Sequence, residues 1–282
     1  MRAEIRQIFY DDSSRRELDP GFLPMDNTAN ARPDWFEFCV IRDYLSRASL
    51  QEDMWYGFLS PKFRLKTGLG AADVLSFLRA SDSYANVALF SNAWDQIAYF
   101  LNSFEQGEFW HPGLTDASQQ FLDRSGVTLD LRRHIAHTGN CVYSNFFAAK
   151  PAFWREWLRL ADGLFDLVEA GQTDLARKLA RKTSYGVEES PYAMKAFVQE
   201  RLAAVLLAGG AYRVAAVDSS DRIPLFDALF RNDGRTRAQL RACDTLKMEY
   251  ALSGGQDKSY LDMYLKLRSS IALLIPMRSP FA

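Results

Sequence analysis

The chain has 282 residues, a formal net charge of −1 and 48% hydrophobic residues, a composition typical of a folded protein with a substantial core. Its basic residues are scattered, which argues against a nucleic-acid-binding face, and its uncharged apolar stretches are shorter than the roughly 20 residues of a membrane-spanning helix. The first residues, MRAEIRQIFYDDSS, lack the apolar core of a signal peptide, and three widely spaced cysteines fit a reducing compartment. We therefore expect a cytoplasmic protein, for which peripheral association with a membrane remains open.

The first predicted element is a short strand over residues 4–10, EIRQIFY, which ends at Asp11, Asp12, Ser13 and Ser14. In open α/β sheets, ligands bind at the carboxyl ends of the strands, so Asp11 and Asp12 are candidate ligand contacts. The alternative is a turn that caps a helix, because Asp and Ser are favoured at such positions.

Residues 25–63 combine a polar turn, an amphipathic helix over 33–46, and a buried strand over 54–59. The polar turn contains Asp26 and Asn27, and Pro33 suits the first turn of the helix. Polar side chains without an evident structural role lie at one end of this unit, and a basic turn lies at the other. This arrangement suggests a ligand crevice. The alternative for Asp26 and Asn27 is that they only shape the turn, since both side chains hydrogen-bond to nearby backbone.

The rest of the chain alternates predicted strands and helices, which favours an α/β fold with a mostly parallel sheet flanked by helices. We expect residues 1–222 to form this domain and residues 223–282 to form a helical extension packed on it. The further predicted elements are helices over 73–79 and 115–125, strands over 86–91 and 141–148, a helix from Pro151, a helix over 192–207, a strand over 212–217, and helices over 225–267 with a break at Gly254 and Gly255.

Several motifs together resemble a family of GT-A-like glycosyltransferases from bacterial capsule and exopolysaccharide loci. These motifs are Asp26-Asn27-Thr28, Glu37 on a helix, Tyr56-Gly57, the basic turn at Lys62 and Arg64, Asn145-Phe146-Phe147, and the helix Phe197-Val198-Gln199-Glu200-Arg201-Leu202. The family carries an Asp-Asn-Thr-Gly turn, a Gly-x-x-His-Tyr-Arg-Arg strand end and a Glu-Arg-Leu helix. The chain departs from it at Ala29, at Cys39 and at Ser60-Pro61-Lys62-Phe63, and the resemblance covers about residues 5–217.

The resemblance implies a GT-A-like fold and the transfer of a sugar from a nucleotide-sugar donor to a saccharide acceptor in surface polysaccharide synthesis. It implies catalytic roles for Asp95, Glu200 and Lys62. The implied substrate-binding residues are Asp11, Asp12, Asp26, Asn27, Glu37, Tyr56, Arg64, Gln96, His111, Asn145 and Arg201.

GT-A enzymes commonly hold Mn²⁺ or Mg²⁺ with an Asp-x-Asp motif, and this chain contains none. Asp95 is a candidate single metal ligand, but Lys62, Arg64 or Arg201 can act as fixed cations instead, so we expect a metal-independent mechanism. Glu200 and Arg201 interrupt an apolar helix, where buried charges are normally paired. A solvated helix pair is the alternative for them.

Other hypotheses remain for the site and for the protein. His111 has aromatic neighbours and a following proline, so a capped loop histidine is the alternative to a substrate contact. A non-catalytic nucleotide-sugar or carbohydrate binding protein on a degenerate GT-A scaffold would tolerate the missing motifs. A hydrolase or another α/β enzyme is disfavoured by the absence of Gly-x-Ser-x-Gly, Gly-x-Gly-x-x-Gly and Walker-type loops.

Overall fold

The computed structural model describes residues 1–185 and 188–275, and its centre is a six-stranded sheet with the order β2-β1-β3-β5-β4-β8. Strand β5 is antiparallel to its neighbours β3 and β4, and the remaining pairs are parallel. The prediction of an α/β fold with a mostly parallel sheet is therefore confirmed. The strands are β1 (Arg2–Phe9), β2 (Leu23–Asp26), β3 (Met54–Leu59), β4 (Val87–Leu89), β5 (Phe147–Ala149) and β8 (Val214–Ala216).

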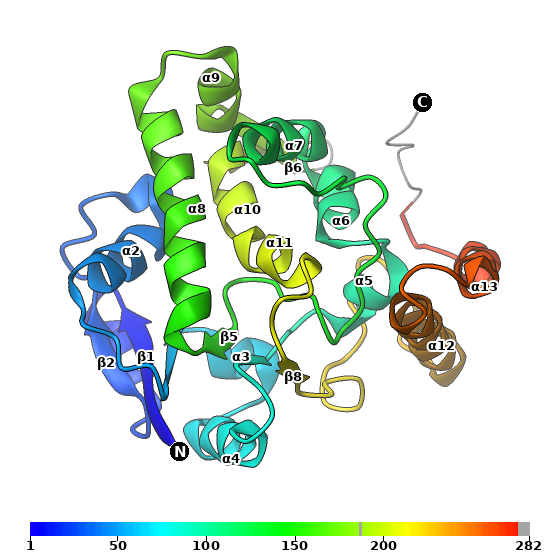
Figure 1. The fold of residues 1–282 in the computed structure, drawn as a ribbon, viewed down its shortest axis with the longest axis horizontal. Helices are drawn as coiled ribbons and strands as arrows, with labels where there is room; N and C mark the ends of the chain where they lie inside the picture. Colours follow the sequence, from blue (N-terminus) through cyan, green and yellow to red (C-terminus); the bar gives the residue numbers. More distant parts are fainter. Residues whose placement is uncertain (186–187, 276–282) are drawn as a thin grey trace.

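Helices cover both sides of this sheet. Figure 1 shows α8 beside α2, α10 and α11, with α4 on the opposite side of the strands. The helices are α1 (Asp12–Arg16), α2 (Phe38–Arg47), α3 (Phe63–Thr67), α4 (Ala71–Ser81), α5 (Trp94–Tyr99), α6 (Ser103–Trp110), α7 (Leu114–Arg124), α8 (Pro151–Ala170), α9 (Asp174–Ala180), α10 (Met194–Gln199), α11 (Leu202–Ala208), α12 (Gly234–Leu252) and α13 (Lys258–Ser270). A 3₁₀ turn, η1 (Pro33–Trp35), precedes α2, and β6 (Lys182–Tyr185) pairs with β7 (Glu188–Ala193).

The main core lies between the central strands and α8. Pro151 occupies the first turn of α8, and apolar residues recur along the helix at the spacing that buries one face. The indole of Trp154 stacks on Phe147 with ring centroids 4.7 Å apart and donates a hydrogen bond to the carbonyl of Tyr56 at 3.0 Å. Because this aromatic layer is fully buried, it fixes the position of the strand ends that carry the polar loops.

Three predicted elements differ from the structure, and each differs where the backbone turns. The predicted strand over 141–148 is wrong except at its end, because Ser144 and Asn145 have φ of 59° and 54° and form a turn before β5. The predicted helix over 33–46 is interrupted by Phe36, which has φ of 51°. In the predicted helix over 192–207, Tyr192 lies in β7 and the helix is divided at Glu200 and Arg201.

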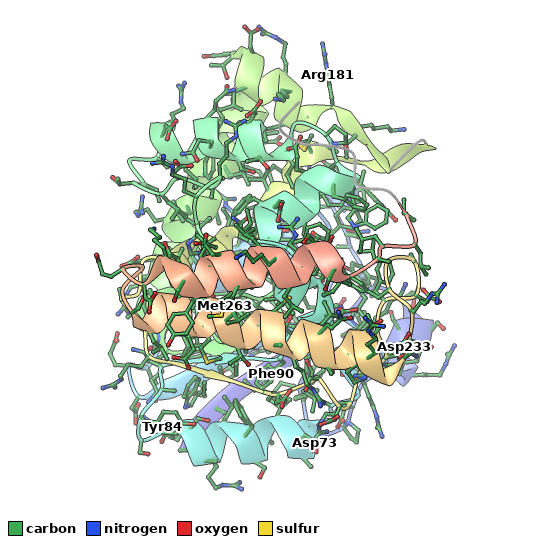
Figure 2. The ribbon with its side chains drawn as sticks, turned by 90° about the vertical axis from the view of Figure 1, so that its right-hand side faces the viewer. Asp73, Tyr84, Phe90, Arg181, Asp233 and Met263 are labelled. Atoms are coloured by element: carbon green, nitrogen blue, oxygen red, sulfur yellow. The ribbon has the colours of Figure 1, made fainter. Side chains whose placement is uncertain are left out.

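Two helices, α12 and α13, occupy most of the range 225–267 that was predicted to be helical, whereas residues 225–233 lie before α12. Helices α12 and α13 are joined at Gly254 and Gly255, whose φ values of 64° and 73° suit glycine. Figure 2 shows the two helices lying side by side, with Asp233 at the start of α12. They pack on α5 through a separate hydrophobic cluster. Among the residues that the structure describes, no helix has the length and apolar character needed to cross a membrane.

Candidate functional site

A pocket of about 750 Å³ lies beyond the carboxyl ends of β1 and β3. The chain runs from β1 to β2 on one side and then to β3 on the other, so the strand order reverses between β1 and β3. Ligands of open α/β proteins bind at this switch point, because two loops diverge there and leave a crevice. The pocket therefore lies where the sequence predicted a crevice, and its volume suits a small-molecule ligand.

Two of the segments that line the pocket have unusual backbone conformations. Phe36 turns the chain so that Glu37 begins α2, and the Glu37 side chain makes no capping hydrogen bond and lines the pocket. Ser144 and Asn145 both adopt left-handed conformations, which are costly for a serine and tolerated by an asparagine. Such strain is often found at binding sites, where the surrounding packing holds it in place.

Three side chains that line the pocket contain a buried polar atom without a hydrogen-bond partner among the described residues. They are the hydroxyl of Ser60, the carbonyl oxygen Oδ1 of Asn145 and the amide nitrogen Nε2 of Gln199. Asn145 is 7% exposed and Gln199 is 4% exposed. Buried polar groups are nearly always paired in native proteins, so three orphaned atoms around one cavity indicate that water, an ion or a ligand completes them.

The charges of the pocket are separated by depth. Lys62 and Lys66 lie on the exposed rim with Asp11 and Glu17, whereas Glu37 and Glu200 are half-buried. Burial raises the pKa of Glu200; the nearby Arg201 opposes this rise, and the carboxylate of Glu37 adds to it. Among the described residues, neither glutamate forms an ion pair, although the charges of Arg201 and Lys66 favour the ionised form of Glu200 and the hydroxyl of Tyr10 is hydrogen-bonded to Glu37. The two glutamates make the interior of the pocket acidic.

One wall of the pocket is aromatic. Phe36 and Tyr192 meet with ring centroids 5.2 Å apart, and Phe197 lies 6.4 Å from Tyr192. His111 stacks behind Phe197 with centroids 3.6 Å apart and is 3% exposed. The hydroxyl of Tyr10 faces Glu37, and burial raises the pKa of Tyr10, with a further contribution from that carboxylate. Both ring pairs are edge-to-face, with interplanar angles of 67° and 72°. Aromatic rings and charged groups lining one pocket suit a ligand that combines a ring with an anionic group.

The structure brings together only some of the residues that the sequence proposed. The predicted residues that line the pocket are Asp11, Glu37, Lys62, Asn145 and Glu200. The predicted residues outside its lining are Asp12, Asp26, Asn27, Tyr56, Arg64, Asp95, Gln96, His111 and Arg201.

Asp95 is buried in α5, where its carboxylate accepts hydrogen bonds from the backbone N–H groups of Gln96 at 2.8 Å and Phe226 at 2.6 Å. Burial raises its pKa, and these two hydrogen bonds partly oppose the rise. The side chain thus attaches the segment before α12 to α5. Its lone pairs are directed at the backbone, so we assign Asp95 no part in the pocket.

Arg201 is also occupied inside the protein. Its guanidinium donates to the carbonyls of Ser103 at 2.8 Å and Phe197 at 2.7 Å, and to the side chain of Gln106 at 2.7 Å. Gln106 in turn donates to the side chain of Gln96. Arg201 therefore joins α6 to α10 and holds Phe197 in the pocket wall without reaching the cavity itself.

The predicted residues near β2 and β3 have local roles. Asp26 is exposed and accepts a hydrogen bond from the backbone N–H of Thr28 at 2.8 Å, while the backbone of Asn27 donates to the carbonyl of Phe9. The hydroxyl of Tyr56 accepts a hydrogen bond from the backbone of Gln51. Asp12 and Arg64 are exposed on α1 and α3. Asp11 caps α1 by accepting a hydrogen bond from the backbone N–H of Ser14, which agrees with the helix-capping alternative given for it in the sequence analysis. Asp11 also lines the pocket.

Sequence reasoning missed other lining residues. Lys66 lies one turn after Lys62 on α3, so the spacing i, i+4 could have indicated a second cation on the same helix face. Tyr192 comes from the β6–β7 hairpin, which the sequence analysis read as part of a helix. Gln199 belongs to a motif that the sequence analysis treated as one apolar helix, so it was not proposed as a site residue. In the structure it is the last residue of α10, just before the break between α10 and α11, and it lines the pocket.

Comparison with protein-family models, curated protein sequences and solved structures finds no match to this chain. The fold and the pocket therefore define an architectural class for the chain and no family. It is an α/β protein with a mostly parallel sheet and a small-molecule-sized pocket at the switch point of that sheet.

Proposed function

We propose that the pocket binds a nucleoside diphosphate sugar and that the protein is a glycosyltransferase with a GT-A-like fold acting on a saccharide acceptor. The observation that supports this most is the position of Lys62 and Lys66 at the start of α3 and within it, directly after β3 and beside a switch-point pocket with an acidic interior and an aromatic wall. This arrangement offers separate contacts to an anionic diphosphate, to sugar hydroxyl groups and to a flat base.

The chemistry follows from these contacts. Bond breaking between the anomeric carbon and the diphosphate leaves negative charge on the departing oxygen, which the ammonium groups of Lys62 and Lys66 stabilise. The acceptor oxygen forms the new bond to that carbon, and its proton passes to the carboxylate of Glu200. A carboxylate with a raised pKa is a stronger base than an ordinary glutamate, which suits this proton transfer.

The roles proposed from the sequence are therefore redistributed. Glu200 and Lys62 keep their proposed catalytic roles, Lys66 joins Lys62, and Asp95 loses its role because its carboxylate holds backbone N–H groups. The aromatic wall of Phe36, Tyr192 and Phe197 takes the base or the sugar ring. A cytoplasmic polysaccharide-building enzyme remains the setting that the resemblance implies.

The test is calorimetric titration of the protein with uridine, adenosine, guanosine and cytidine diphosphates, compared with Lys62→Gln and Lys66→Gln. A charged hydrogen bond contributes about 1.5 to 3 kcal/mol, so each variant should lose about tenfold or more in affinity for the preferred nucleotide. Lys266→Gln is the matched control, because Lys266 is exposed on α13 and outside the pocket. Absence of binding by all four nucleotides, or equal affinities in all variants, would contradict the proposal.

A further inference from the structure

The inner part of the pocket is lined by more hydrogen-bond acceptors than donors. Glu37 and Glu200 are half-buried carboxylates, and the side chain of Asn145, which is 7% exposed, contains a carbonyl oxygen without a hydrogen-bond donor among the described residues. The amide nitrogen of Gln199 and the hydroxyl of Ser60 are unpaired donors in the same lining. A ligand group bound here must therefore mostly donate hydrogen bonds, as hydroxyl groups do.

Both glutamates bring negative charge into this space. The hydroxyl of Tyr10 is hydrogen-bonded to Glu37, which satisfies part of that carboxylate without neutralising it. Burial raises the pKa of Glu200; the charges of Arg201 and Lys66 oppose the rise, and the charge of Glu37 adds to it. The proposed reaction requires Glu200 as a carboxylate, so the interior holds two like charges while the enzyme awaits its substrates.

The sugar of a bound donor lies close to these two carboxylates. In the proposed reaction, Glu200 takes the proton of the acceptor hydroxyl as that oxygen bonds to the anomeric carbon, while the diphosphate is held at the rim by Lys62 and Lys66. Glu37 is near enough to Glu200 for its charge to act on it. The sugar ring is therefore bound in the part of the pocket where a further negative charge is screened less than at the surface.

We propose that the pocket selects donors whose sugar carries no negative charge, and that Glu37 and Glu200 reject the corresponding uronic acids. This inference rests on the proposed function. Repulsion of the wrong ligand is a common source of specificity, because a like charge placed against it costs binding free energy that a neutral ligand keeps. A hexose and its uronic acid differ only at carbon 6, where a carboxylate replaces a hydroxymethyl group, so their affinity ratio measures this repulsion.

The experiment measures the affinity of nucleotide sugars by calorimetry at neutral pH, using the nucleotide whose diphosphate binds most tightly. Two matched pairs separate charge from sugar configuration: the glucose and glucuronate derivatives, and the galactose and galacturonate derivatives. Wild type is compared with Glu37→Gln and Glu200→Gln. The controls are Glu17→Gln, which removes an exposed carboxylate at the rim, and Asp262→Asn, at an exposed position of α13. Circular dichroism and thermal melting confirm that each variant is folded.

The expected result is a change in the ratio of two affinities. Wild type should bind the neutral sugar of the preferred pair at least about tenfold more tightly than its uronic acid, and each interior glutamine variant should reduce this ratio by at least about threefold, because one repelling charge is removed. Glu17→Gln and Asp262→Asn should change the ratio by less than about twofold, since exposed charges are screened by salt. A purely structural disturbance of the pocket would weaken both members of a pair and leave their ratio unchanged.

Each contrary result has a definite meaning. Equal affinities for the two members of each pair in wild type would overturn the selectivity and leave nucleotide binding, and with it the proposed function, intact. A tenfold ratio that persists in both interior variants would show that these carboxylates do not reject the uronic acid. A reduction by Glu17→Gln as large as that by Glu37→Gln would place the repulsion at the rim and overturn the assignment. Absence of binding by every nucleotide sugar and every free nucleoside diphosphate would contradict the selectivity and the proposed function together.

Discussion

The pocket and the contact between the C-terminal helices and α5–α6 contain similar residue types in opposite situations. At the C-terminal contact, the guanidinium of Arg268 lies 2.9 Å from the carboxylate of Glu105, and both side chains are nearly buried. The ammonium of Lys247 is fully buried and donates to the carbonyls of Ile97 and Phe100. In the pocket, by contrast, Glu37 and Glu200 form no ion pair with any residue that the structure describes, although they too are withdrawn from water. Glu37 has only the hydrogen bond to the hydroxyl of Tyr10.

This difference separates structural charge from functional charge. A buried charge with a complete set of partners makes two elements depend on each other, and removing one partner leaves the other stranded. A half-buried charge without an ion-pair partner loses part of its hydration with little in return, so it is retained at a cost to stability. Burial alone therefore does not show whether a charged residue has a structural or a functional role. The number of its ion-pair and hydrogen-bond partners separates the two.

The largest expected effect comes from breaking the buried ion pair between Arg268 and Glu105. Arg268→Met should lower the free energy of unfolding by about 3 to 5 kcal/mol, because Glu105 then remains buried and charged without its cation. Urea unfolding measures the loss, and calorimetry at low temperature measures nucleotide affinity per folded molecule, which should not change.

A double variant controls this experiment. Glu105→Gln together with Arg268→Met removes both charges and should recover part of the lost stability, since the amide oxygen can still accept the hydrogen bond from the backbone of Leu101. A single variant as stable as wild type would show that the pair is not needed to hold α13. A loss of nucleotide affinity per folded molecule would show that the two regions are coupled.

The sequence predicted the sheet well because its signals are local. Short apolar runs such as residues 54–59 specify buried strands, and Pro151 and the apolar spacing of α8 specify a long helix. The location of the crevice followed from the same reasoning, since polar residues after β1 and β3 mark the carboxyl ends of strands. Glu37, Lys62 and Glu200 were found in this way.

The predicted residues that lie outside the pocket lining make contacts that are distant in sequence. Asp95 follows a central strand, as a ligand-binding carboxylate would, but Phe226, which lies 131 residues later, supplies the N–H that occupies it. Arg201 was proposed as a site cation, yet its partners come from α6 about 100 residues earlier. No local pattern reports such partners. The turn at Ser144 and Asn145 was missed because neither residue is a glycine, and strand propensity continues on both sides of it.

A second, smaller effect is expected from replacing Glu200, one of the two pocket glutamates without an ion pair among the described residues. The pKa of Glu200 is raised in the folded state, so the folded protein holds that proton more tightly than the unfolded chain does. The ionised side chain therefore reduces stability above the folded-state pKa, and the penalty disappears as pH falls below the unfolded-state pKa. Glu200→Gln should raise Tm at pH 8 by about 2 to 4 °C, the shift that about 1 kcal/mol produces in a domain of this size.

The pH dependence provides the control for this prediction. At pH 4 most of the advantage of the glutamine variant should be absent, because wild-type Glu200 is then largely protonated. Thermal melting at both pH values, with Asp262→Asn for comparison, measures the difference. A variant less stable than wild type at pH 8 would mean that the Glu200 carboxylate has partners that stabilise the fold, and it would remove Glu200 from the unpaired group.

The smallest expected effect concerns Asp26, which the resemblance to glycosyltransferases placed in the donor site. Its carboxylate is exposed and outside the pocket lining, and its hydrogen bond to the backbone of Thr28 shapes the turn after β2. Asp26→Ala should change Tm by less than about 2 °C, as is usual for surface positions, and should leave nucleotide affinity unchanged within about twofold. Asp26 pairs with Phe9 at the end of the β1–β2 register. Strand β1 is also held by six register pairs with β3, so a small shift of the turn after β2 should leave the crevice between β1 and β3 unchanged. A tenfold loss of affinity with an unchanged Tm would instead extend the donor site across the end of β2, and would restore to Asp26 the role that its sequence motif implied.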